Sequence, residues 1–554
     1  MIDLEGTTLR RVLESHARTR PSAPALLSPA DASFNYVQLL AAANRTRGWL
    51  ASSGLGANSR IAVLLPTGLP LALASIAVAC TATPLPLHPG LTPPVLAALL
   101  REARTDAVIG LPGDAVAQAL AQQLGAQALP FDLPGLLLPA TEAADEGEDP
   151  GTAPAPGDTA FVLFTSGTSG ISKRVPLTHE QVLASARSIA QHLDLAPDDR
   201  GLLLMPTFHG HGLIGGLLAP LVAGSSVVCA PGFEAARFLH WMADFDPTWY
   251  TAAPSIHQAV IDLAARREAA WPRHRLRFAG SASSALPSSL MRDLEALWQV
   301  PVIEAYAMTE AATQMTSNPL PPGIRKPGSV GPPAGALVRV VDPLGRELPC
   351  NTEGRIVVRG PALFGGYEDA PALNAEAFLD GWFITGDLGW LDSDGYLHIA
   401  GRSCELIDRG GEKISPREVE LALLALPAVA QAAAYPAPHP TLGEDVHAAV
   451  VLARNEATDA QALRQALFGM LADFKIPARI HLLEPLPTGT AGKVQRRQMH
   501  EQLQSIARAS AGVVEAAPPT PFQARIAAHF AQALRLPAGS GDANFLELGG
   551  DSLS

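Results

Sequence analysis

The residues from Phe161 to His179 bring together the chemical groups that hold a phosphate. Their sequence is FVLFTSGTSGISKRVPLTH, an apolar run that leads into hydroxyl and glycine residues and then into Lys173. Glycines let the backbone approach an anion closely, hydroxyls donate hydrogen bonds, and lysine supplies a positive charge. The spacing differs from the G-x-x-x-x-G-K-S/T loop, so we expect a different type of phosphate-binding loop. The hydroxyl and glycine residues of this loop are Thr165, Ser166, Gly167, Thr168, Ser169 and Gly170.

Lysine is scarce in this chain, which uses arginine for most of its 40 basic residues. Each lysine is therefore a candidate for a site that needs a flexible point charge rather than a planar guanidinium. Codon bias and chance are the alternative explanation for any single one. The five lysines are Lys173, Lys326, Lys413, Lys475 and Lys493.

Composition excludes several classes of protein. The 554 residues carry a formal net charge of −13, which argues against a duplex nucleic-acid binder. Hydrophobic residues make up 47% and charged residues 17%, which indicates a globular chain rather than a disordered one. Four separated cysteines without a C-x-x-C pair exclude a disulfide scaffold and fit a reducing compartment. No apolar run reaches the ~20 residues of a membrane-spanning helix, so we expect a soluble, cytoplasmic protein with no nucleic-acid or membrane partner.

Buried strands must position the candidate loop. Apolar β-rich runs alternate with helical segments as far as residue 307, which predicts an α/β architecture with a parallel sheet. From about Gly335, short strands joined by turns such as DPLG and DSDG predict a β-rich subdomain. The stretch 139–158 is rich in proline, glycine and acidic residues and predicts a surface loop.

The phosphate loop and six further segments occur in the order typical of the adenylate-forming superfamily. MPTFHGHG (205–212) looks like the acid-pocket segment of that family, and AGSASSALP (279–287) and EAYAMTE (304–310) look like its adenine and magnesium segments. ITGDL (384–388), GRSCELIDRGGEKISPREVE (401–420) and PTGTAGKVQRR (487–497) match the remaining motifs. The chain thus resembles acyl-CoA synthetases, peptide-synthetase adenylation domains and luciferases over about residues 10–500.

The resemblance implies two adenylation domains. The larger is an N-terminal core of mixed sheets flanked by helices with a β-rich subdomain (1–401). The smaller is a mobile α+β C-terminal subdomain (402–508), with a hinge at Cys404 and with Lys413 in a loop that faces the site during thiolation. Relatives usually carry Asp or Lys at the hinge position.

The implied reaction is attack of a carboxylate on the α-phosphate of ATP, followed by transfer of the acyl group from acyl-AMP to a thiol. The first step brings anions together and needs cations and a metal. By resemblance, the catalytic residues are Lys173, Lys493, Thr309 and Glu310, of which Glu310 holds Mg²⁺. Tyr306 would face adenine, although it is also a plausible core residue, and Asp387 would bind the ribose. The other implied nucleotide-binding residues are the loop residues 165–170 and Ser281, Ala282, Ser283 and Arg402.

The acid substrate is expected to be small and to lack an α-amino group. Relatives that activate amino acids hold the ammonium with an Asp in the segment that here reads FHGH, which has no carboxylate. The sequences of this segment and of residues 248–258 and 314–331 are similar to those of oxalate–CoA ligase-like members. Arg325 suits an acid with extra oxygens. A gate formed by His209 and a histidine metal pair remain alternatives. The implied substrate-binding residues are His209, His211, Gly280 and Ala305.

The C-terminal segment NFLELGGDSL (544–553) resembles the phosphopantetheine attachment site of carrier proteins. Ser552 would carry the 4′-phosphopantetheine, after a linker (509–519) and within a partial helical carrier domain (520–554). We therefore expect a piece of a longer synthetase that loads a carrier in cis or in trans and works with downstream modules. Acyl transfer to free CoA is the alternative, and a catalytically silent docking segment is a third interpretation.

Overall fold

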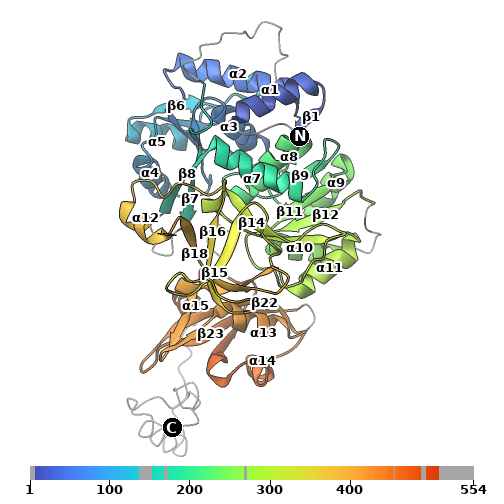
Figure 1. The fold of residues 1–554 in the computed structure, drawn as a ribbon, viewed down its shortest axis with the longest axis vertical. Helices are drawn as coiled ribbons and strands as arrows, with labels where there is room; N and C mark the ends of the chain where they lie inside the picture. The colour runs from blue at the N-terminus through green and yellow to red at the C-terminus, as the bar shows by residue number, and fades with distance from the viewer. Residues whose placement is uncertain are drawn as a thin grey trace, which may run out of the picture. The chain divides into compact units, whose positions relative to one another are not determined.

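The computed structural model describes residues 6–30, 32–136, 153–166, 172–266, 271, 273–453, 456–487 and 494–510. The chain forms two compact units, Met1–Ile399 and Ala400–Ser554, and each is described here by itself (Figure 1). Residues 511–519 of the expected linker and the whole expected carrier domain lie outside the described residues, and linker residues 509 and 510 belong to the last helix, Arg496–Ser510. The expected domain boundary after residue 401 falls two residues beyond the boundary between these units.

The first unit begins with two helices and a four-stranded parallel sheet in the order β4-β3-β5-β6. Helix α3 is apolar and buried along its length, because ten of its eleven residues are buried. No described helix is long and apolar enough to cross a membrane. The elements are α1 (Leu9–Thr19), α2 (Tyr36–Ser52), β3 (Arg60–Val63), α3 (Leu69–Ala79), β4 (Thr83–Pro86), α4 (Pro93–Glu102), β5 (Ala107–Gly110), α5 (Ala115–Leu124), β6 (Gln127–Pro130) and α6 (Leu133–Leu136).

An eight-stranded sheet in the order β14-β13-β12-β11-β9-β10-β1-β2 forms the centre of the unit. Its six inner strands are parallel, and the outer strands β2 and β14 are antiparallel to their neighbours. This confirms the expected α/β class with a mainly parallel sheet. The strands are β1 (Pro24–Leu27), β2 (Ser33–Asn35), β9 (Arg200–Leu203), β10 (Ser226–Cys229), β11 (Trp249–Ala252), β12 (Phe278–Ser281), β13 (Val302–Met308) and β14 (Thr313–Ser317).

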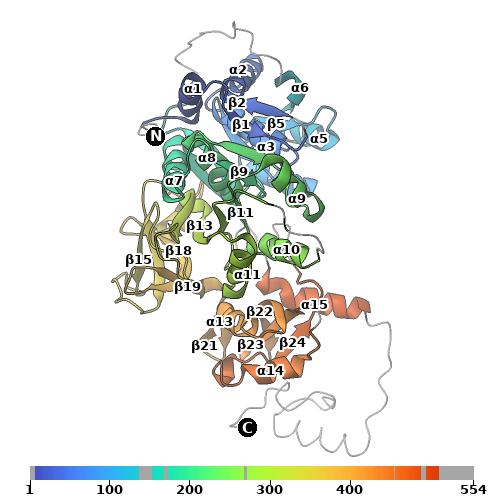
Figure 2. The same ribbon diagram turned by 90° about the vertical axis from the view of Figure 1, so that its right-hand side faces the viewer.

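Helices cover this sheet. Figure 2 shows α9, α10 and α11 one after another along the strands, where buried residues such as Phe238, Met242 and Leu294 pack against β11 and β12. The helices are α7 (His179–His192), the π-helix η1 (His211–Leu218), α8 (Ala219–Ala223), α9 (Ala235–Phe245), α10 (Pro254–Ala265), α11 (Ser288–Trp298) and the single 3₁₀ turn η2 (Thr309–Ala311).

An antiparallel hairpin carries the predicted phosphate loop at its tip. It consists of β7 (Thr159–Ser166) and β8 (Ser172–Thr178), and Thr165 pairs with Lys173 near the tip. The β-rich subdomain expected after Gly335 follows as an antiparallel sheet with one helix. Its elements are β15 (Leu337–Val341), β16 (Gly354–Arg359), α12 (Pro371–Ala377), β17 (Phe378–Leu379), β18 (Trp382–Leu391) and β19 (Leu397–Arg402).

The second unit is an α+β fold with strands in the order β21-β20-β23-β22 and β24 beside β23. Ile407, Val419, Leu423, Val446 and Leu467 contribute to its core. Its elements are η3 (Ser403–Glu405), β20 (Ile407–Arg409), β21 (Glu412–Ile414), α13 (Pro416–Leu424), β22 (Val429–His439), β23 (Gly443–Leu452), α14 (Ala460–Leu467), η4 (Asp473–Lys475), β24 (Arg479–Leu482) and α15 (Arg496–Ser510).

Candidate active site

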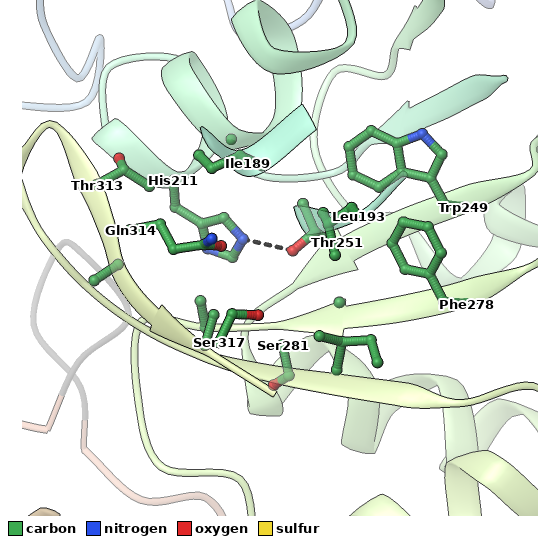
Figure 3. A pocket seen from close by; sticks show the side chains of 16 residues that line it. Ile189, Leu193, His211, Trp249, Thr251, Phe278, Ser281, Thr313, Gln314 and Ser317 are labelled. Carbon is green, nitrogen blue, oxygen red and sulfur yellow. Dashed lines mark hydrogen bonds between the residues drawn. The ribbon is translucent and has the colours of Figure 1, made fainter. Parts of the chain in front are cut away.

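A pocket lies in the first unit against one face of β11, β12 and β13 (Figure 3). Alternate residues of β11 and β13 line it, as expected because side chains one residue apart on a strand point to opposite faces, whereas Gly280 and Ser281 at the end of β12 both line it. The cavity has a volume of about 40 Å³, which gives room for about three water molecules. The lining residues on these three strands are Trp249, Thr251, Phe278, Gly280, Ser281, Ile303, Ala305 and Ala307.

The pocket has an apolar end and a polar end. At the apolar end the rings of Trp249 and Phe278 stack with their centroids 5.6 Å apart. Ile189 and Leu193 also line the pocket. At the polar end lie His211 from η1 and hydroxyl and amide side chains from β11 and β14. None of the described lining residues is a lysine or arginine, so the polar end offers mainly neutral hydrogen-bond donors.

His211 is held by two hydroxyl groups. Its Nε2 atom lies 2.7 Å from Thr251 Oγ1, and its Nδ1 atom lies 2.9 Å from Ser283 Oγ. Gly280 leaves room for this contact, because a Cβ atom there would lie 2.9 Å from Thr251 Oγ1. Gly212 allows the tight turn into η1, since a Cβ atom there would lie 2.2 Å from the carbonyl oxygen of Pro206. The glycines of this segment thus place His211 at the pocket with a fixed ring orientation.

Three polar atoms of pocket residues are buried without a hydrogen-bond partner among the described residues. They are Oγ of Ser281, Oγ1 of Thr313 and Nε2 of Gln314. Thr313 also has a φ of +98°, a left-handed value that is strained for a β-branched residue. An unsatisfied buried polar group costs about 1–3 kcal/mol, so each of these three atoms carries a burial cost that a bound polar ligand would relieve.

A buried hydrogen-bonded chain supports the floor of the pocket from behind. Nε2 of His257 lies 3.0 Å from the carbonyl oxygen of Gly280, and its Nδ1 lies 3.3 Å from the hydroxyl of Tyr250. That hydroxyl accepts a hydrogen bond from Trp298 Nε1 at 3.0 Å. Burial lowers the pKa of His257 to about 4, so its ring is neutral at physiological pH. A neutral ring can donate to Gly280 and accept from Tyr250, which satisfies the whole chain.

The expected adenine and ribose residues contact each other. The hydroxyl of Tyr306 on β13 donates to Oδ2 of Asp387 on β18, and both side chains are buried. The backbone N–H of Asp387 donates to Thr385 Oγ1 at 3.1 Å, which fixes the turn around the carboxylate. The structure therefore brings together two residues that the sequence separates by 81 positions.

Lys173 and Glu310 lie on either side of a tyrosine that the sequence did not single out. Nζ of Lys173 lies 4.8 Å from the ring centroid of Tyr367, and the hydroxyl of Tyr367 donates to Oε1 of Glu310 at 2.7 Å. No described residue makes another hydrogen bond to the Glu310 side chain. Glu310 thus offers its other carboxylate oxygen to a hard cation such as Mg²⁺. No group of three or more His, Cys, Asp or Glu among the described residues is placed to hold a metal, so the HGH segment gains no third ligand there.

The environment of the scarce lysines singles out one of them. In the described part of the chain, Lys326 pairs with Asp392 and Asp394, Lys413 with Asp408, and Lys475 with Glu418. Lys173 has the Tyr367 ring as its contact and makes no salt bridge with a described residue. Ion pairs therefore account for three of these lysines and leave Lys173 as the one suited to an external anion.

Several predicted site residues have a different outcome. His209 is not a lining residue of the pocket and packs edge-on against Phe208, with ring centroids 4.6 Å apart. Arg325 pairs with Glu295 at 3.0 Å instead of lining the pocket. In the second unit, Arg402 and Cys404 are exposed, and the carbonyl oxygen of Cys404 accepts a hydrogen bond from Arg497. The residues Gly167–Gly170, Lys493 and Ser552 and the side chain of Ser166 lie outside what the structure describes.

Comparisons with known proteins identify the family of the chain and its fold. The family model of the AMP-binding enzymes matches residues 13–368, and that of the AMP-binding enzyme C-terminal domain matches residues 418–493. The oxalate–CoA ligase of Arabidopsis thaliana is 35% identical over 89% of this chain and 98% of its own length. The sulfoacetate–CoA ligase of Cupriavidus necator is 36% identical over 89% and 97%. The crystal structure of ATP-bound MatB from Rhodopseudomonas palustris superimposes with a TM-score of 0.78 at 29% identity, over 90% of this chain and all of MatB.

Proposed function

The chain belongs to the AMP-binding enzyme family, and from this premise we propose that it joins a small, oxygen-rich carboxylic acid to coenzyme A at the expense of ATP. It is an adenylate-forming acid–thiol ligase. In the proposed reaction a carboxylate oxygen attacks the α-phosphorus of ATP and pyrophosphate leaves. The thiolate of CoA then attacks the acyl carbon, and AMP leaves with the carboxylate oxygen.

The three unpartnered donors in the pocket are the observation that supports the substrate class. Ser281, Thr313 and Gln314 would give a bound acid hydrogen bonds that no described protein group takes up. The small volume favours a short acid over a long acyl chain, and the described lining has no carboxylate that would hold an ammonium group. A short acid with a second oxygen-bearing group satisfies these conditions. Relatives named for oxalate and sulfoacetate act on acids of this kind.

The residues outside the pocket have proposed roles in handling the nucleotide. Lys173, with Thr309 and the loop residues 165–170, would bind the phosphates, and Asp387 would accept hydrogen bonds from the ribose hydroxyls. Glu310 would hold Mg²⁺, which supplies positive charge to the phosphates. Lys493 would bridge the attacking carboxylate and ATP as a mobile cation. Arg402 would add a ribose contact.

Coenzyme A is the proposed thiol because the relatives that match most of the chain are CoA ligases. This reverses the expectation from the sequence, which put a carrier protein first. The carrier motif with Ser552 lies beyond both family matches, which end at residue 493. It keeps carrier loading as the second candidate function, with a phosphopantetheine on Ser552, a carrier in cis or in trans and downstream modules as partners.

Acid-dependent exchange between ATP and labelled pyrophosphate tests the first step. We expect exchange with oxalate, malonate, glycolate or sulfoacetate and far weaker exchange with hexanoate or with α-amino acids. No exchange with any acid by folded protein would overturn the proposed adenylation. Acyl transfer is tested by supplying CoA and, separately, a complete phosphopantetheinylated carrier domain. Faster release of AMP with the carrier than with CoA would overturn the choice of CoA.

A further inference from the structure

The segment between β16 and α12 contacts both residues proposed to bind the nucleotide phosphates and Mg²⁺. The N–H of Phe364 donates to the carbonyl oxygen of Glu310 at 2.8 Å, and the Phe364 ring packs edge-on against Tyr367. The Tyr367 hydroxyl donates to the Glu310 carboxylate at 2.7 Å, while its ring lies under Lys173. One phenol side chain thus touches a cation with its face and an anion with its hydroxyl.

The backbone of Tyr367 is fixed by a single side chain. Its N–H donates to Oδ1 of Asn374 at 2.7 Å, and its carbonyl oxygen accepts from Nδ2 of Asn374 at 2.8 Å. Gly366 has a φ of +132°, and a Cβ atom there would lie 3.0 Å from Asn374. Tyr367 itself is only 6% exposed. Both of its backbone polar groups are therefore satisfied in one conformation, which leaves its side chain little freedom.

The next residue ties the segment to the strand that carries Lys173. The N–H of Glu368 donates to the carbonyl oxygen of Arg174 at 3.2 Å, and its carboxylate accepts from Arg60 and Arg174. The hydrogen bonds from these two guanidinium groups lower the pKa of Glu368, so it stays ionised. Lys173 and Arg174 are neighbours on β8, as Tyr367 and Glu368 are in the segment. The ion pair between Glu368 and Arg174 thus keeps the side chain of Tyr367 beside that of Lys173.

The position of Tyr367 prevents an ion pair between Lys173 and Glu310. Lys173 and Glu310 carry opposite charges and contact the same tyrosine. A direct ion pair between them would compete with phosphate for the ammonium and with Mg²⁺ for the carboxylate. The ring face attracts the ammonium without using its N–H groups. The hydroxyl binds one carboxylate oxygen and leaves the other. No Lys173–Glu310 salt bridge exists among the described residues, in agreement with this separation.

We propose that Tyr367 is a positioning residue that keeps Lys173 and Glu310 apart and oriented for the phosphates and the metal of the nucleotide. The proposal rests on the proposed function, because it takes these two residues as the phosphate and Mg²⁺ ligands. It assigns the phenol hydroxyl to Glu310 and the phenol ring to Lys173. Removal of each part should therefore have a different effect.

The test measures nucleotide binding by calorimetry and Mn²⁺ binding to the protein–ATP complex by electron paramagnetic resonance, in the full chain and without acid. Tyr367→Phe keeps the ring and should weaken Mn²⁺ binding about tenfold, because a hydrogen bond to a charged group is lost, while metal-free ATP binds as in the wild type. Tyr367→Leu should weaken both. Tyr396→Phe is the matched control, since Tyr396 also lies under a lysine, 4.4 Å from Lys326 Nζ, and donates its hydroxyl to a backbone oxygen.

A double variant separates the proposal from a general loss of structure. In Tyr367→Leu, Lys173 should pair with Glu310, so adding Glu310→Gln should restore metal-free ATP binding. A purely structural defect would not be reversed by a second substitution. Wild-type-like binding by Tyr367→Leu, or no recovery in the double variant, would overturn the proposal. Absence of ATP binding by the wild type would instead overturn the proposed function on which it rests.

Discussion

Replacement of Thr313 by valine should make the free protein more stable and should weaken binding of the acid. Oγ1 of Thr313 is buried in the pocket without a hydrogen-bond partner. Valine keeps the volume and the β-branch, and hence the strain of the positive φ, and removes only the hydroxyl. An unsatisfied buried hydroxyl costs about 1–3 kcal/mol. We therefore expect the free energy of unfolding to rise by about 1 kcal/mol, the lower end of that range.

Thr316 provides a matched control on the same strand. It is fully buried, and its hydroxyl donates to the carbonyl oxygen of Val330 at 2.7 Å. Thr316→Val leaves that oxygen unpaired, so the free energy of unfolding should fall by about 1–3 kcal/mol. The same substitution three residues apart is thus expected to have opposite effects on stability.

Urea unfolding without ligands measures the stability change, and steady-state kinetics measures the KM of the acid. For Thr313→Val the KM should rise about tenfold, as expected for the loss of one hydrogen bond to a charged group. The KM of ATP should stay unchanged, and Thr316→Val should alter neither constant in the protein that remains folded. If Thr313→Val destabilises the protein as much as Thr316→Val and leaves the KM of the acid unchanged, the hydroxyl is not a ligand-directed donor.

Three further predictions concern other residues. His211→Ala removes the ring that Thr251 and Ser283 orient, so exchange assays should show at least a tenfold higher KM for the acid, whereas an unchanged KM would exclude His211 from the pocket's function. Lys493→Ala should abolish adenylation while calorimetry still detects Mg-ATP binding, and near-normal exchange would refute the role of Lys493. Burial lowers the pKa of His257 to about 4, below the ~6.5 of an unfolded histidine, so the unfolded state binds more protons between these values. The free energy of unfolding should therefore fall by up to about 3 kcal/mol as the pH drops from about 6.5 to about 4. In His257→Gln the free energy of unfolding should depend less on pH over this range. The same pH dependence in both proteins would contradict the lowered pKa of His257.

The sequence predicted those parts of the fold and the site that depend on local pattern and on the alternation of side chains along a strand. Apolar runs predicted the parallel strands, and the alternation along β11, β12 and β13 is what brings Thr251, Gly280 and Ala305 to one pocket. The apolar run before the hydroxyl and glycine residues predicted strand β7, and Lys173 on its partner β8 has no salt bridge to a described residue. Local pattern and strand periodicity suffice for such features.

Contacts that depend on chain reversals could not be predicted in this way. Thr313 and Gln314 reach the pocket only because β14 turns back antiparallel to β13 after two consecutive residues with positive φ, Ala312 and Thr313. No glycine marks that turn. Tyr367 meets Glu310 and Lys173 across 57 and 194 residues of chain, respectively, and no motif links the three. Long-range packing, rather than local pattern, decides these positions.

Transfer of oxygen from the acid to AMP tests the central claim most directly. The enzyme is given ATP, CoA and a small acid whose carboxylate carries ¹⁸O, and the nucleotide product is analysed by mass spectrometry. Attack of the carboxylate on the α-phosphorus predicts AMP with one ¹⁸O per turnover, together with an equal amount of acyl-CoA. Unlabelled AMP, or ADP and phosphate in its place, would contradict the adenylate mechanism.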